Sequence, residues 1–113
     1  MQSVDVGFPR VLQYRQGNSV EVRVEFSRNP ESYLSVMPTR VFIKASGSKA
    51  SAISIDKVKA ITFDAASRTL RITVEGGERG TSLGPMTRSV WDQFGTLCDE
   101  HFQGKLPLSS EGD

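Results

Sequence analysis

The sequence predicts a mostly β fold of the α+β class: an antiparallel bent sandwich or partial barrel of about seven strands, capped by one C-terminal amphipathic helix. Apolar side chains alternate with charged or polar ones in residues 20–26 and again in residues 70–74, as in strands with one dry face. Residues 87–103 instead place their apolar side chains three and four positions apart, which forms one stripe along a helix. Such a helix is unstable alone in water, so its stripe must pack on the sheets.

The first half of the chain divides into strands at its turn residues. Gly17 and Asn18 tolerate positive φ and separate two strong strand candidates, which we expect to form a hairpin. Pro30 and Pro38 mark the next two breaks. The strands expected here are residues 4–8, a short edge strand interrupted by Pro9, and then 11–15, 20–26, 33–37 and 39–45.

The second half begins with two expected strand pieces, 53–55 and 57–63, with a bend or a bulge at Asp56 between them. The clear alternation of residues 70–74 follows a tight turn. A glycine-rich turn then leads to a short final strand. The remaining expected strands are 70–74 and 81–83, with turns at 64–67 and 76–80.

The segment 87–103 is the one expected helix. Thr87 or Ser89 can serve as its N-cap, and Gly104 suits the position just after its end. Gly95 lies inside the helix, where glycine costs about 1 kcal/mol relative to alanine. We expect Gly95 to let the helix approach a strand closely.

Length, charge and cysteine content bound the class of protein. The 113 residues fit one domain, which we place at 1–104, with a flexible tail at 105–113. The net charge of +1 gives no bulk signal for nucleic acid. A signal peptide is not evident, and no apolar run has the length of a membrane span. Cys98 is the only cysteine, so an internal disulfide cannot form, as is usual in a reducing compartment. Together these features lead us to expect a soluble, cytoplasmic protein. The sequence gives no signal for an oligomeric state.

The order of elements resembles a pleckstrin-homology-like domain, in which short strands precede one C-terminal helix that commonly buries a tryptophan. Trp91 lies in the first half of the expected helix. Ile55, Val58 and Ile61 match an apolar-x-x-Val-x-x-Ile strand of such domains, and Leu-Arg-Ile at 70–72 resembles the strand that follows. The resemblance covers roughly the C-terminal half of the chain. It implies two sheets closed at one end by the helix, and a lipid, peptide or protein as ligand.

Lipid-binding members of this family often carry an Arg-x-Arg-like pair on the second strand of the first hairpin. Here Arg15 ends the first strand, and Glu21 stands two positions before Arg23 on the second. An acidic residue therefore breaks the pair and repels a phosphate group. The resemblance thus implies a protein or peptide ligand rather than a phosphoinositide.

Cys98 and His101 are three residues apart and share a face of the expected helix. A thiolate–imidazole pair can act as a nucleophile, but both residues fall in the apolar stripe, where cysteine packs as a small hydrophobic side chain. His101 is the only histidine and Asp99 points elsewhere, so these residues do not form a metal-ligand set. The glycine-rich segment 76–84 lacks the Lys-Ser/Thr pair of a phosphate-binding loop. We expect no enzymatic activity, no cofactor and no metal.

Basic and aromatic side chains mix along the expected strands. Proteins that bind single-stranded nucleic acid stack bases on aromatic rings and hold phosphates with Arg and Lys. The alternative interpretation is that Arg23 pairs with Glu21 or Glu25 on a solvated face, and that the aromatic side chains belong to the core. The candidate binding residues are Arg10, Tyr14, Arg15, Arg23, Tyr33, Phe42 and Lys44.

These patterns favour a non-enzymatic interaction module. Its expected ligand is a protein segment, held on a sheet edge or in the groove between helix and sheet. Binding of single-stranded nucleic acid by the basic strand face is the first alternative. An enzyme that uses Cys98 is the second alternative.

Overall fold

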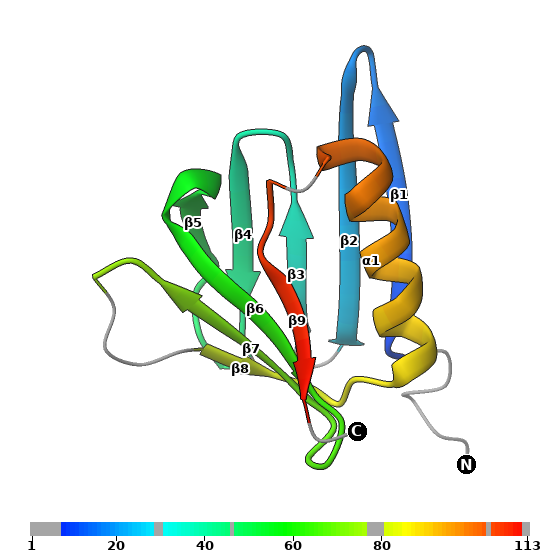
Figure 1. The fold of residues 1–113 in the computed structure, drawn as a ribbon, viewed down its shortest axis with the longest axis vertical. Coiled ribbons are helices and arrows are strands. Elements are labelled where there is room, and N and C mark those ends of the chain that lie inside the picture. Colours follow the sequence, from blue (N-terminus) through cyan, green and yellow to red (C-terminus); the bar gives the residue numbers. More distant parts are fainter. Residues whose placement is uncertain (1–7, 29–30, 46, 77–80, 104, 112–113) are drawn as a thin grey trace.

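The computed structural model describes residues 8–28, 31–45, 47–76, 81–103 and 105–111. Within these residues the chain forms nine strands, one short 3-10 helix and one α-helix (Figure 1). The elements in order are β1 (Arg10–Gln16), β2 (Ser19–Arg28), β3 (Glu31–Val36), β4 (Arg40–Lys44), β5 (Ser51–Ser54), the 3-10 helix η1 (Ile55–Lys57), β6 (Val58–Asp64), β7 (Thr69–Val74), β8 (Thr81–Leu83), α1 (Arg88–Phe102) and β9 (Leu108–Glu111).

The strands form two sheets. The first sheet has the order β1-β2-β3-β4-β5, and the second has the order β8-β7-β6-β9. The predicted class is confirmed: the protein is mostly β, with one C-terminal helix among the described residues. Two details were wrong, because the described strands number nine rather than about seven, and one strand pair, β6 with β9, is parallel. The sheets do not close into a barrel.

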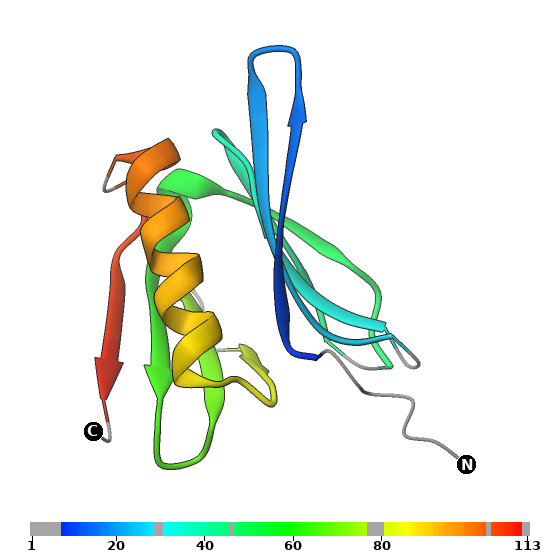
Figure 2. The same cartoon turned by 90° about the vertical axis from the view of Figure 1, so that its right-hand side faces the viewer.

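The β1–β2 hairpin follows from the alternation in β2. Val22, Val24 and Phe26 are fully or almost fully buried, and the charged residues between them face away from the core. Gly17 has a φ of 62° in the hairpin turn, a conformation that glycine adopts at little steric cost. Figure 2 shows this hairpin projecting beyond the rest of the first sheet.

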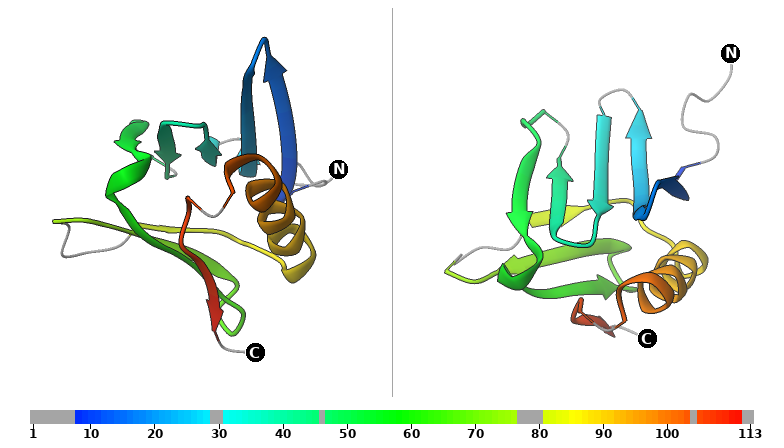
Figure 3. Two further views of the ribbon diagram at one scale, coloured as in Figure 1. Left: turned by 45° about the horizontal axis from the view of Figure 1, so that its top comes forward. Right: turned by 90° about the horizontal axis from the view of Figure 1, so that it is seen from above.

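The chain passes from the first sheet to the second through η1. The predicted bend at Asp56 is confirmed, because η1 separates β5 from β6 and turns the chain through a corner (Figure 3). The backbone N–H of Ile55 donates a 3.0 Å hydrogen bond to the carbonyl of Thr39, which ties this corner to the first sheet. The two strand pieces expected at 53–55 and 57–63 correspond to β5 and β6, with bounds shifted by one or two residues.

The helix lies on the other open side of the two sheets, next to β1, β2 and β9 (Figure 3). The hydroxyl of Thr87 accepts a 3.2 Å hydrogen bond from the N–H of Val90, so Thr87 is the N-cap. Gln103 ends the helix in a left-handed conformation with a φ of 50°. The predicted range of 87–103 is thus confirmed to within one residue at each end.

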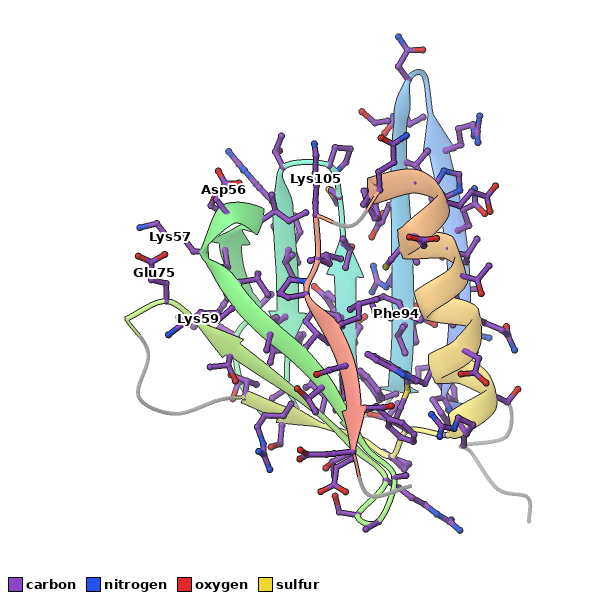
Figure 4. The ribbon with its side chains drawn as sticks, in the orientation of Figure 1. Asp56, Lys57, Lys59, Glu75, Phe94 and Lys105 are labelled. Carbon is purple, nitrogen blue, oxygen red and sulfur yellow. The ribbon has the colours of Figure 1, made fainter. Side chains whose placement is uncertain are left out.

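The apolar stripe of α1 completes the core. Trp91 stacks on Phe63 of β6 with ring centroids 5.8 Å apart, and Phe94 lies 5.9 Å from Trp91. Figure 4 shows Phe94 extending from the helix into the space between the sheets, where it is fully buried. The same figure places a group of mixed charge, Asp56, Lys57, Lys59 and Glu75, on the side of the molecule away from α1.

The flexible tail predicted at 105–113 is wrong for residues 106–111. Leu106 is buried, and β9 pairs with β6. The N–H of Ile61 donates to the carbonyl of Pro107 at 3.0 Å, and that of Ala65 donates to the carbonyl of Glu111 at 2.9 Å. The segment Leu-Ser-Ser-Glu lacks alternation and has little strand propensity. Pairing with a strand far away in the sequence supplies its hydrogen-bond partners.

Three expectations fall wholly or mainly outside the described residues. They are the edge strand at 4–8, of which only Phe8 is described, the role of Gly104 after the helix, and the turn at 76–80, of which only Gly76 is described.

We predict that Trp91→Ala lowers the free energy of unfolding by about 3–5 kcal/mol, because it removes a large buried aromatic side chain. Denaturant unfolding followed by circular dichroism measures this change, since the variant has no tryptophan for fluorescence. A loss below about 1 kcal/mol would show that the Trp91–Phe63 contact does not support the fold.

Candidate functional site

Most of the predicted binding residues lie on one face of the first sheet, the face directed away from the second sheet, here called the outer face. Arg10, Glu25, Tyr33 and Lys44 are directly opposed on successive strands and therefore form one row across it. Tyr14 and Glu21 are opposed in the same way. Arg23, Ser35 and Phe42 form a parallel row. Arg15 is the exception, since it is opposed to Val20 and lies on the other face of β1.

The two arginines among the candidate residues of the outer face, Arg10 and Arg23, have acidic partners. Arg10 Nη2 lies 2.8 Å from Glu25 Oε1, and Arg23 lies 3.2 Å from Glu25, 3.8 Å from Glu21 and 3.7 Å from Glu31. The contact of Arg23 Nε with Glu25 lacks hydrogen-bond geometry, so it is an ion pair only. The interpretation of Arg23 as a partner of acidic neighbours is confirmed.

The aromatic residues of this face are not part of the core, contrary to the alternative interpretation. Tyr33 and Phe42 are half-buried, and Tyr14 is 48% exposed. The guanidinium of Arg23 lies 3.9 Å from the centroid of the Tyr33 ring, a cation–π contact. Lys44 Nζ donates to the carbonyl of Ser48 at 2.8 Å. The outer face is thus a balanced network of charges and rings, and its guanidinium groups already have carboxylate partners.

Cys98 is unsuited to nucleophilic chemistry. Its side chain is buried, and this burial raises the pKa of the thiol to about 12. The Nε2 atom of His101 lies 3.2 Å from the side-chain nitrogen of Gln13 on β1.

Within the described part of the chain, no group of three or more His, Cys, Asp or Glu residues could hold a metal ion. No described helix is long and apolar enough to span a membrane.

A groove runs between the helix and β9, the edge strand of the second sheet. Its volume is about 510 Å³. It continues into a smaller hollow of about 260 Å³, here called the Gly95 hollow, which is lined by Gly95, Cys98, Asp99, Leu106 and Leu108. We call this feature the α1–β9 groove, and it is lined by Trp91, Asp92, Gly95, Thr96, Asp99, Leu108, Ser109 and Ser110.

Gly95 lies at the middle of the helical wall of the α1–β9 groove. The expectation that it permits close packing on a strand was wrong, because a Cβ atom built there meets no atom within 4 Å. The helix therefore carries glycine at a cost of about 1 kcal/mol in propensity, without a packing reason. What the missing side chain leaves is open space in the groove.

Asp99, on the same wall, also lowers the stability of the helix. It lies in the last turn of α1, where the negative end of the helix dipole opposes a carboxylate by about 0.3–1 kcal/mol. Asp92 lies seven residues earlier and also lines the groove. Both side chains are exposed. Residues that lower local stability tend to mark functional sites.

The other wall is a sheet edge. The carbonyls of Pro107 and Glu111 accept hydrogen bonds from β6. Because the backbone groups of successive residues in a strand point to opposite edges, the N–H and C=O groups of Leu108 point away from β6. An edge strand offers such groups to a further strand. The sequence did not reveal this wall, because β9 lacks a strand pattern. Gly95 and Asp99 are the signals that could have indicated the groove.

We predict that Gly95→Ala raises the free energy of unfolding by about 1 kcal/mol, because the methyl group enters open space and alanine favours the helix. Gly84→Ala is the matched control. A Cβ atom there would lie 3.1 Å from the carbonyl oxygen of Arg68, so this variant should not be stabilised. Thermal and denaturant unfolding measure both variants. A destabilised Gly95→Ala protein would contradict the open space that the structure shows beside Gly95.

We predict that Cys98 reacts slowly with a thiol reagent between pH 7 and 9 in the native protein. A pKa of about 12 leaves roughly one thiol in ten thousand ionised at pH 8, and only the thiolate reacts fast. Labelling in denaturant should be rapid. Fast native labelling with a midpoint below the ordinary cysteine pKa of about 8.5 would contradict the burial.

The sequence was compared with protein-family models and with curated proteins. No protein-family model matches the sequence. No curated protein matches it either. The candidate site therefore rests on its own geometry.

Proposed function

We propose that this protein is a non-enzymatic interaction module that binds an extended segment of a partner protein in the α1–β9 groove. The observation that carries the proposal is the pairing of the two walls, one a helix with a glycine at its centre and the other an edge strand. Extended peptides bind sheet edges by strand addition, in which main-chain hydrogen bonds give affinity and side-chain pockets give specificity. The groove offers both, because Leu108 presents its peptide groups and the Gly95 hollow accepts a side chain.

We further propose that the chain is a pleckstrin-homology-like domain. The support is the order of elements: a first sheet of five strands, a corner into a second sheet, and one helix at the open side of the two sheets. The tryptophan expected in the helix packs on β6, the strand that contains the Val-x-x-Ile pattern of Val58 and Ile61. β9, which follows the helix, is an addition to the order of strands and C-terminal helix that the resemblance implies.

The outer face of the first sheet supports nucleic-acid binding less well. Six of the seven candidate residues share this face, but Arg10 and Arg23 are ion-paired with Glu25. A phosphate group would have to displace those carboxylates and would meet their negative charge. The same acidic residues weigh against a phosphoinositide ligand.

A random-peptide display library tests the proposed function. We predict that the wild-type protein enriches a family of peptides that Gly95→Leu does not capture, because the leucine side chain fills the groove. Gln93→Leu is the matched control, since it adds the same side chain to an exposed part of α1 that does not line the groove. Circular dichroism confirms that both variants are folded. If no enriched peptide depends on Gly95, the proposed groove function is wrong.

A further inference from the structure

We infer that the partner segment in the α1–β9 groove is basic, with the pattern cation-x-apolar-x-cation, and that it adds as a strand to the outer edge of β9. This inference rests on the proposed function and names the chemistry of its ligand. The two cations would pair with Asp92 and Asp99, and the apolar side chain would enter the hollow at Gly95.

The charge of the groove indicates the sign of its ligand. Among the described residues that line it, Asp92 and Asp99 are acidic and none is basic. Within the described residues, every ion pair that the structure forms lies on the first sheet. The two aspartates therefore lack a cationic partner in that part of the chain. Arg88, the first residue of α1, and Lys105, beyond its end, do not line the groove. A cationic ligand would supply the missing partners.

The spacing of the aspartates fits an extended chain. Seven residues of helix separate them by about 10.5 Å along the axis. Residues i and i+4 of a strand lie about 13 Å apart on the same face, a difference that long Arg or Lys side chains can span. Gly95 is three residues after Asp92 and four before Asp99, so the hollow lies opposite residue i+2. Cations at both ends and an apolar residue between them therefore share one face.

The register of β9 indicates which residues of an added strand would face the helix. Leu108 is opposed to Ile61, which is fully buried, so Leu108 lies on the core-facing side of the sheet. Ser109 is opposed to Thr62 on the other side, where their hydroxyls lie 3.0 Å apart. A strand added beside β9 would continue this alternation. Its residues i, i+2 and i+4 would face the helix, and the two x residues would face solvent.

Fluorescence anisotropy with three labelled peptides tests this inference. They contain Arg-Ser-Leu-Ser-Arg, Glu-Ser-Leu-Ser-Glu or Arg-Leu-Ser-Ser-Arg within identical serine and glycine flanks. The third peptide keeps the charge but turns the leucine to the solvent face. We predict that the first peptide binds tightest, and that the double variant Asp92→Asn, Asp99→Asn weakens it about 3- to 10-fold, as expected for two exposed ion pairs.

The control is Glu100→Gln, which removes one negative charge from the residue next to Asp99, outside the groove. It should leave the affinity within about twofold of wild type. Equal or tighter binding of the glutamate peptide, or an equal effect of Glu100→Gln, would overturn the inference. If library peptides depend on Gly95 but lack the basic pattern, the inference fails and the proposed function stands. If the arginine peptide binds Gly95→Leu as well as wild type, the inference fails, and the proposed function fails too if no library peptide depends on Gly95.

Discussion

The contact between the apolar stripe of α1 and the two sheets is the interaction on which the rest of the structure depends. The corner at η1 joins the sheets on one side only. On the other side Trp91 covers Phe63, and Phe94 fills the interior. Without the helix, the inner faces of β2 and β6 would be exposed to water at a large cost in free energy. The same contact places α1 beside β9, so the groove is a consequence of how the core is closed.

The helix combines a stabilising face with an unfavourable one. Its buried stripe and its Thr87 cap favour the fold. The wall toward β9 carries Gly95 and Asp99, which both lower helix stability. A helix optimised only for stability would have alanine and a basic residue at these positions. The structure therefore separates the part of the helix that holds the core together from the part that borders the groove.

The two surfaces that could bind a ligand differ in how their charges are used. On the outer face of the first sheet, each charged residue of the central rows has a partner, and Arg23 alone contacts three glutamates and the Tyr33 ring. Such a network holds its side chains in place and offers little net charge to a ligand. In the α1–β9 groove the aspartates face open space beside a sheet edge. Carboxylates without a cationic partner among the described residues, next to backbone groups that can add a strand, are the better basis for recognition.

The sequence by itself determined the elements whose local pattern agrees with their environment. The alternation in β2, the stripe of α1 and the bend at Asp56 predicted the class, the helix and the corner, because a period of 2 or 3.6 is a property of neighbouring residues. Only the tertiary structure decided the site. β9 is a strand because β6 supplies its hydrogen bonds, and Gly95 borders a groove because β9 lies opposite. The face that collects Arg10, Tyr33 and Lys44 likewise depends on strand register, which pairs residues far apart in the chain.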